Sequence, residues 1–173
     1  MPPGGIYIAV ITGTPHGARR TVGSQIDPVE AFYRQRFADA VRLAHLLTGD
    51  PSIAEDLAQD AFERVRPRFD GLSSPWAYLR AAVVNACRSH HRSRLRAADR
   101  ARRADRPADS MLGAHELLDA VDALPYRQKA VIVLRYYEDL PERDIATALG
   151  CRPGTVKSLA SRALQRLAQE IQR

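Results

Sequence analysis

The sequence predicts an all-α protein of two small helical domains joined by a flexible linker, with a helix-turn-helix in the second domain. Apolar residues recur at helical spacing from Asp27 onward, except in one segment rich in Arg, Ala and Asp. Near the C-terminus, Gly150 and Pro153 mark a sharp corner between two helices. We therefore assign a leader to residues 1–25, a first domain to 26–95, a linker to 96–113 and a second domain to 114–173.

The leader gives little information. Its apolar run IYIAVI is far too short to span a bilayer, and no basic region precedes it, so we expect neither membrane insertion nor a signal peptide. Residues 12–24 are rich in Gly, Pro, Thr and Arg, which is typical of a flexible segment. Translation starting near Ile26 stays an alternative, and no function is assigned to this leader.

Two amphipathic helices are expected next. The first begins after Asp27 and ends at Gly49, and Asp50 and Pro51 provide a cap and a first turn for the second. The second helix has an apolar stripe and an opposite, mainly acidic face, which comprises Glu55, Asp56, Gln59, Asp60, Glu63 and Arg64. This face is either simply solvated or a docking surface for a basic partner, and periodicity does not choose between them.

A third long helix is predicted after the loop FDGLSS, with Ser74 as its cap and Pro75 in its first turn. Its apolar stripe comprises Trp76, Leu79, Val83, Ala86 and Cys87, and another face repeats Arg80, Arg88 and Arg92. Residues 80–106 hold nine Arg against two Asp, which favours a polyanionic partner over a plain solvated face. The two aromatic residues that open this helix are either ordinary packing residues or platforms for unpaired bases.

Beyond the linker, helices are expected over residues 115–124 and 126–137, followed by the helix-turn-helix. In that motif Ile145, Leu149 and Val156 would fill the angle between the two helices. The outward-facing residues would be Thr155, Lys157, Ser158, Ser161 and Arg162. An ordinary helical hairpin is the alternative to a DNA-binding motif.

Catalytic and metal-binding signatures are missing from the sequence. Cys87 and Cys151 are too few and too far apart for a disulfide framework or a four-ligand zinc site, which fits a reducing cytoplasm. Cys87, His90 and His91 lie close in sequence but lack further ligands nearby. We find no glycine-rich phosphate loop, nucleophile elbow or HExxH pair, so we expect no enzyme activity, cofactor, metal or small-molecule substrate.

Four segments in this order closely resemble extracytoplasmic-function RNA polymerase sigma factors: AEDLAQDAFERV, PWAYLRAAVVNACRSHHRSR, LDALPYRQKAVIVLRYYEDLPERDIATALG and CRPGTVKSLASRAL. The resemblance covers about residues 27–170. It implies an alternative sigma factor of actinobacterial type that directs promoter recognition, promoter opening and transcription initiation. The implied partners are bacterial core RNA polymerase and promoter DNA in the cytoplasm. Whether an anti-sigma factor binds the chain stays open.

The resemblance also implies roles for individual residues. Core polymerase would be bound by Asp56, Gln59, Asp60 and Glu63. A flipped base of the minus-ten element would be captured by Asp70, Gly71, Leu72, Ser73 and Ser74. Other contacts near the separated strands would come from Trp76, Tyr78, Arg80, Asn85, Arg88 and Arg92. The minus-thirty-five element would be read by Arg152, Thr155, Val156, Lys157, Ser158, Ser161 and Arg162.

Three positions depart from the pattern of that family. Arg152 stands where a capping serine is common, Leu159 where an arginine is common, and Pro141 where a small capping residue is frequent, although proline also suits a first turn. These departures leave the upstream promoter sequence open. Two other functions compete: a stand-alone helix-turn-helix regulator, which leaves the acidic helix unexplained, and a helical adaptor that binds only protein, which gives the helix-turn-helix no role.

Overall fold

The computed structural model describes residues 27–102 and 116–171, and in these ranges its regular structure is all helical, with no strand. The predicted leader therefore lies outside the described residues. The elements are α1 (Pro28–Thr48), α2 (Pro51–Val65), the 3₁₀-helix η1 (Arg66–Gly71), α3 (Pro75–Arg102), α4 (Glu116–Asp122), α5 (Tyr126–Tyr136), α6 (Glu142–Leu149) and α7 (Pro153–Ile171). The all-α prediction is confirmed.

Local chemistry sets the first helix boundaries where the sequence predicts them. Asp27 caps α1 through its side chain, and Gly49 ends this helix in the left-handed conformation with φ of 76°. Oδ1 of Asp50 then accepts hydrogen bonds from the amides of Ser52 and Ile53 at 3.0 and 3.1 Å. These amides have no partner within α2 itself, so the carboxylate satisfies them and fixes the start of the helix.

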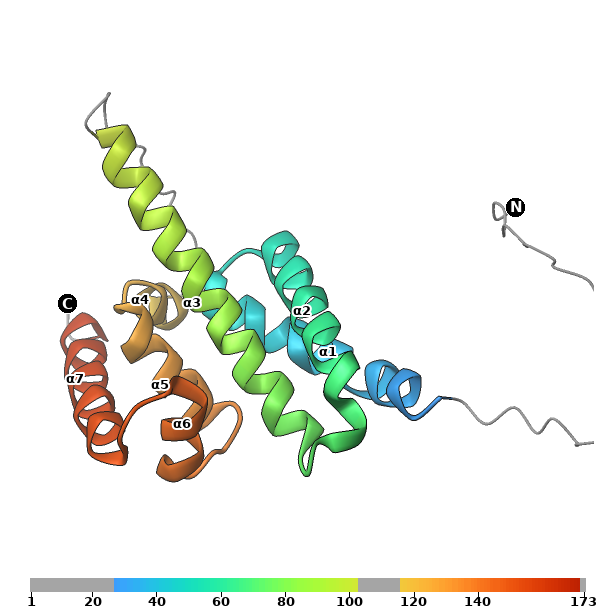
Figure 1. Ribbon diagram of the computed structural model, residues 1–173. Helices are drawn as coiled ribbons and strands as arrows, with labels where there is room; N and C mark the ends of the chain where they lie inside the picture. Colours follow the sequence, from blue (N-terminus) through green and yellow to red (C-terminus); the bar gives the residue numbers. More distant parts are fainter. Residues whose placement is uncertain (1–26, 103–115, 172–173) are drawn as a thin grey trace, which may run out of the picture.

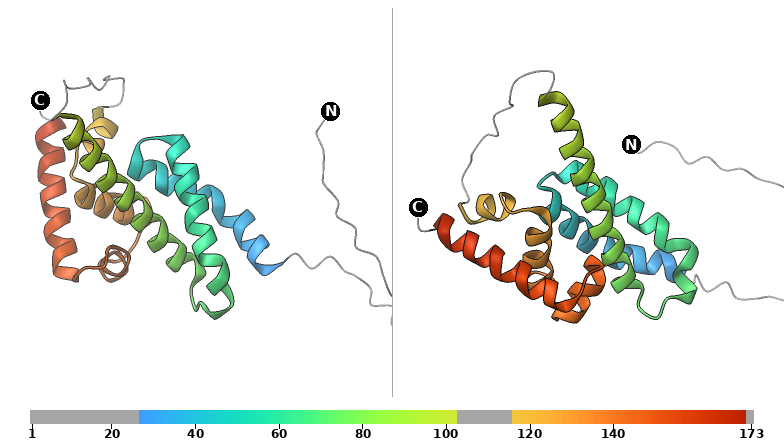
Figure 2. Two further views of the ribbon diagram at one scale, coloured as in Figure 1. Left: turned by 45° about the horizontal axis from the view of Figure 1, so that its top comes forward. Right: turned by 60° about the vertical axis from the view of Figure 1, so that its left-hand side comes forward.

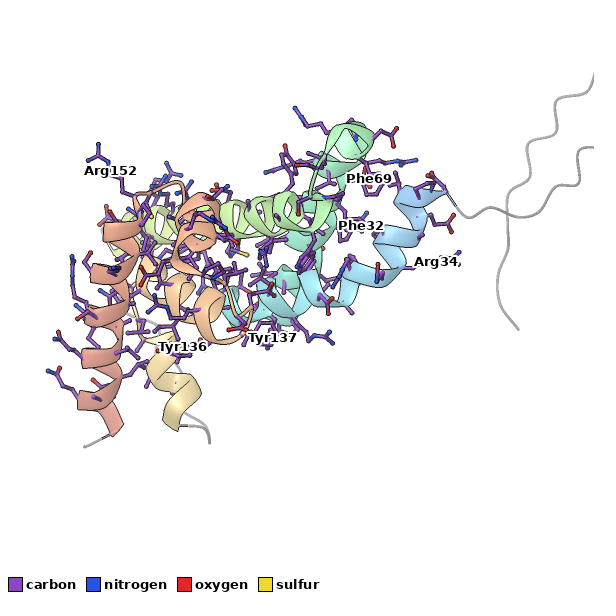
Figure 3. All side chains as sticks on the ribbon, turned by 90° about the horizontal axis from the view of Figure 1, so that it is seen from below. Phe32, Arg34, Phe69, Tyr136, Tyr137 and Arg152 are labelled. Atoms are coloured by element: carbon purple, nitrogen blue, oxygen red, sulfur yellow. The ribbon has the colours of Figure 1, made fainter. Side chains whose placement is uncertain are left out.

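An aromatic cluster joins α1, α2 and η1. The Phe62 ring packs edge-on to Tyr33 with centroids 4.9 Å apart, and Phe32 packs against Phe69 at 5.3 Å (Figure 3). Phe69 lies in η1, where the sequence analysis expected the loop FDGLSS to begin, so that segment is partly helical. Its contact with Phe32 anchors η1 and leaves the residues that follow in the turn between η1 and α3.

Helix α3 is longer than predicted. It continues to Arg102, whereas the linker was expected to begin at residue 96. The extra residues, 96–102, extend past the other helices, so apolar periodicity is not needed there, and their Ala and Arg content favours helix intrinsically (Figure 1). The rest of the predicted linker, residues 103–113, lies outside the described residues.

Helix α3 crosses the middle of the molecule, with α1 and α2 on one side and α4 to α7 on the other (Figures 1 and 2). We call α1 to α3 the N-terminal domain and α4 to α7 the C-terminal domain. One continuous apolar core runs through both, because α5 and α6 pack against α3 and α5 also contacts α1. A smaller apolar cluster joins α4, α5 and α7. The sequence predicts the two domains but not their contact, which we call the interdomain seam.

Candidate functional site

The acidic face of α2 is available to a partner. Asp56, Gln59, Asp60 and Glu63 are all exposed, and their spacing places them along a single stripe of the helix. Gln59 accepts a hydrogen bond from the Tyr33 hydroxyl at 3.0 Å and donates one to Glu63 at 3.2 Å. In the described part of the chain none of the three carboxylates has an ion-pair partner, so their charge is free to attract a basic surface.

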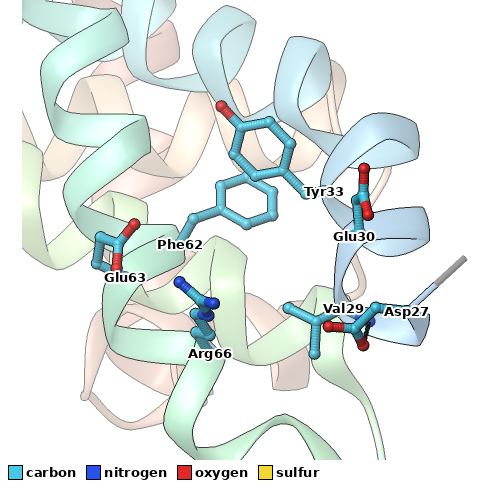
Figure 4. A pocket seen from close by; sticks show the side chains of 7 residues that line it. All are labelled: Asp27, Val29, Glu30, Tyr33, Phe62, Glu63 and Arg66. Atoms are coloured by element: carbon cyan, nitrogen blue, oxygen red, sulfur yellow. Dashed lines mark hydrogen bonds between the residues drawn. The ribbon is translucent and has the colours of Figure 1, made fainter. Parts of the chain in front are cut away.

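A pocket of about 270 Å³ adjoins this stripe, between the start of α1 and the end of α2 (Figure 4). Tyr33 and Phe62 supply aromatic surface, and Glu63 and Arg66 supply opposite charges. The stripe therefore lies beside a partly apolar hollow, a combination typical of protein-docking surfaces. Sequence periodicity did not indicate this pocket, because its walls come from two helices.

The predicted minus-ten residues fall into an exposed and a covered group. Asp70, Gly71, Ser73 and Ser74 are exposed, whereas Leu72 is half-buried against the core. Tyr78 is also exposed. Trp76 is half-buried, with the guanidinium groups of Arg36 and Arg80 at 5.2 and 5.7 Å from its ring centroid. Trp76 thus packs against cations in this arrangement.

Arg80 makes the main polar contact across the interdomain seam. Its Nη1 lies 3.1 Å from Oε2 of Glu138, in the turn between α5 and α6, and both side chains are largely buried, with 11% and 8% exposed. The arginine side chains farther along α3 are less buried. Arg88 is half-buried and donates to Oδ1 of Asn85 at 2.7 Å, while Arg92 is exposed.

The corner of the helix-turn-helix is a Schellman motif. Gly150 adopts φ of 60° and ψ of 47°, as a left-handed turn residue, and its amide donates to the Thr147 carbonyl at 3.2 Å. The Cys151 amide donates to the Ala146 carbonyl at 2.9 Å. These two bonds satisfy carbonyl groups that α6 leaves open and turn the chain directly into α7, which begins at Pro153 as predicted.

Helix α7 presents a mixed polar surface. Arg152, Lys157, Ser161 and Arg162 are exposed, and Arg152 projects from the end of the molecule (Figure 3). Thr155 and Ser158 are half-buried, and the Ser158 hydroxyl donates to the Thr155 carbonyl at 3.0 Å. The expected contact between DNA and the Val156 side chain is corrected here. Val156 is fully buried and fills the angle between α6 and α7 instead.

Two positions that depart from the family pattern contribute backbone caps. The Arg152 carbonyl accepts from the amides of Thr155 and Val156 at 2.9 and 3.4 Å, so its backbone opens α7 where a serine side chain is common. Pro141 precedes α6 instead of occupying its first turn, and its carbonyl accepts from Asp144 and Ile145.

Several residues at the seam were not predicted from the sequence. The Tyr126 hydroxyl donates to the Val84 carbonyl at 2.7 Å in a buried contact, and Nε of Arg42 donates to the Tyr137 hydroxyl at 3.2 Å. The third contact is the one between Glu138 and Arg80. Each contact joins residues far apart in sequence, so no local pattern could have indicated it.

Titration chemistry at the seam reflects burial. Burial raises the pKa of the Cys87 thiol to about 12, so this side chain is an uncharged packing residue. Burial, helped by the positive charges of Arg94 and Lys129, lowers the pKa of His91. The described residues contain no group of three metal-ligating side chains. Nor do they include a helix with the length and apolar character needed to cross a bilayer.

Comparison with known proteins assigns the family. Residues 32–97 match the model "Sigma-70 region 2", and residues 114–167 match "Sigma-70, region 4". The RNA polymerase sigma-E factor of Streptomyces avermitilis is 34% identical over 151 residues, which cover 83% of this chain and 84% of that protein. The chain is an extracytoplasmic-function sigma factor of the sigma-70 family.

Other relatives agree with this assignment. The sigma-E factor of Streptomyces coelicolor is 33% identical over 150 residues, covering 82% of this sigma factor and 85% of the relative. The solved structure of the sigma factor RpoE in complex with the anti-sigma factor NepR from Bartonella quintana matches with a TM-score of 0.67 at 24% identity. It covers 83% of this chain and 96% of that one, and supports the fold alone. This protein therefore acts in transcription initiation as an alternative sigma factor, with core RNA polymerase and promoter DNA as its partners.

Proposed function

We propose that this sigma factor divides its work among three surfaces. The acidic stripe of α2 docks on core RNA polymerase, the turn before α3 and the basic face of α3 bind the opened minus-ten element, and the exposed face of α7 reads the minus-thirty-five duplex. The observation that carries the proposal is the exposed acidic stripe in the same chain as a Schellman-type helix-turn-helix. A stand-alone DNA-binding regulator has no use for such a stripe.

The chemistry of each surface supports its assignment. Three exposed carboxylates suit a basic protein partner and would repel DNA phosphates. Tyr78 and the arginines of α3 offer stacking and charge to unpaired bases. Lys157 and Arg162 are exposed on α7 and suit phosphate contacts in a duplex, because each can neutralise one backbone charge. We further propose that the protein works in the cytoplasm and performs no catalysis itself.

Charge reversal tests the docking surface. Asp60→Lys should weaken binding to purified core polymerase, because it places a cation in the middle of the stripe. Glu170→Lys is the control for the same change of charge, since Glu170 is exposed on α7 in the other domain. Binding is measured by fluorescence anisotropy of the labelled full chain. Equal affinities for the two variants would contradict the proposed surface.

Transcription tests the complete function. Purified core polymerase with the full chain should initiate at a discrete set of genomic sites, which sequencing of the transcript 5′ ends would map. These sites would define both promoter elements. Initiation that does not depend on the added chain would refute the proposed function.

A further inference from the structure

The leader, residues 1–25, is positively charged and contains no Asp or Glu. Its two arginines, Arg19 and Arg20, are neighbours, and Arg20 precedes Asp27 by seven positions. The leader lies outside the described residues, but the place where it joins the fold is defined, because Asp27 caps the start of α1.

The leader joins the fold beside the acidic stripe of α2. Asp27, at the start of α1, and Glu63, near the end of α2, line the same pocket of about 270 Å³ (Figure 4). Three carboxylates and one guanidinium line this pocket, so its net charge is negative. Glu63 is also the last member of the stripe, which continues from the pocket along the exposed side of α2.

The length of chain between Arg20 and Asp27 is sufficient to reach the whole stripe. An extended chain advances at most about 3.6 Å per residue, so Arg20 can lie up to roughly 25 Å from Asp27. The stripe from Glu63 to Asp56 covers seven residues of helix, or about 10 Å. Both arginines can therefore meet any carboxylate of the stripe.

Other carboxylates near the junction already have cationic partners. Glu30 pairs with Arg34 at 2.5 Å, and Asp39 pairs with both Arg36 and Arg42. Within the described residues, no arginine or lysine forms an ion pair with a carboxylate of the stripe. The stripe is thus the acidic surface near the junction that best complements the two arginines of the leader.

We propose that the leader binds back onto the acidic stripe, with Arg19 and Arg20 paired to its carboxylates and Val22 placed over the pocket. There Tyr33 and Phe62, with ring centroids 4.9 Å apart, supply apolar surface for the valine. The inference rests on the proposed role of the stripe in docking core polymerase. Leader and polymerase need the same carboxylates, so the leader competes with polymerase from within the same chain.

The competition is partial because of the strength of the contacts. Exposed ion pairs are individually weak, whereas the short connection to α1 keeps the two arginines at a high effective concentration near the stripe. The leader therefore occupies the stripe for part of the time and lowers the apparent affinity for core polymerase several-fold without abolishing it.

Cross-linking tests the contact directly in the full chain. Arg20→Lys keeps the charge and supplies an amine, which a carbodiimide couples to a carboxylate that touches it. Proteolysis and mass spectrometry should find this amine joined to a carboxylate of the stripe. The native pair Lys157 and Glu142, with Nζ and Oε2 3.8 Å apart, is the internal control for the reaction.

Three outcomes of this cross-linking would overturn the inference. The first is the absence of the leader product in a sample where Lys157 is joined to Glu142. The second is coupling mainly to Glu30, which is nearer along the chain and lies off the stripe. The third is a product with twice the mass of the chain, which would show that the leader binds a second copy instead.

Affinity for purified core polymerase tests the competition. In the full chain, Arg19→Ser with Arg20→Ser should tighten binding several-fold in fluorescence anisotropy, and the gain should shrink as salt rises, because salt screens exposed charges. Arg127→Ser with Arg166→Ser is the matched control, since it removes two charges from exposed positions of the C-terminal domain.

A gain no larger than that of the control pair would overturn the competition. The cross-link forms without polymerase, whereas the role of the stripe in docking is tested by Asp60→Lys. A failure of the proposed docking surface is therefore distinguished from a failure of the leader contact.

Discussion

Two glycines at the start of α7 should respond in opposite directions to the same substitution. Gly150 has φ of 60°, whereas Gly154 lies in the first turn of α7. A Cβ at either position would have no neighbouring atom within 4 Å, so steric clashes with other residues contribute nothing. The difference between Gly150→Ala and Gly154→Ala therefore isolates the conformation of the backbone.

The magnitudes follow from that conformation. A left-handed residue with a Cβ costs about 1–2 kcal/mol, and alanine recovers part of this by restricting the unfolded chain, so Gly150→Ala should lose about 1 kcal/mol. Gly154→Ala should gain about 0.5 kcal/mol, because alanine favours helix. At position 150 the loss should be largest for valine and smallest for asparagine, which tolerates the left-handed region.

Urea unfolding of the full chain, followed by far-UV circular dichroism, measures these free energies. Equal slopes with denaturant among the variants would show that only stability has changed. If both alanine variants shift the unfolding free energy in the same direction by the same amount, the left-handed corner does not determine the stability of this motif.

Two further predictions concern the thiols and α7. In the folded Cys151→Ser variant at pH 8, Cys87 should resist alkylation until urea is added, because burial raises its pKa to about 12 and blocks access to the thiol. Mass spectrometry detects the adduct. Rapid labelling of the folded protein would contradict the buried position. The double variant Lys157→Ala, Arg162→Ala should bind duplex promoter DNA more weakly. The slope of log affinity against log salt concentration should become less steep by about one unit for each lost phosphate contact. An unchanged slope in binding titrations at several salt concentrations would show that these residues do not contact DNA.

The helix boundaries could be predicted because their causes are local. Asp50 and Pro51 begin α2, and Gly150 and Pro153 form the corner, each through backbone geometry within a few residues. The end of α3 was predicted too early, because that prediction relied on apolar periodicity. Apolar periodicity reports packing, and residues 96–99 of α3 are helical although they are exposed.

The candidate site was only partly predictable, because periodicity defines a face but not what covers it. The acidic stripe of α2 is exposed as expected. Val156, predicted both as a core residue and as a DNA contact, is fully buried, so its role in packing is the one the geometry supports. Glu138 resembles any charged residue of a polar turn, and its contact with Arg80 depends on how the two domains meet.

Leu159 connects a departure from the family pattern with the interdomain seam. Its side chain is 9% exposed and belongs to the core that both domains share. Together with Arg88, Arg92 and Tyr126 it lines a hollow of about 340 Å³. An arginine here would bring another cation toward two existing ones and would require desolvation of its charge, so it would oppose the contact between the two domains. Leucine avoids both costs and also removes a cation from α7. Leucine at position 159 thus favours the contact between the two domains and reduces the positive charge that α7 can offer to duplex DNA.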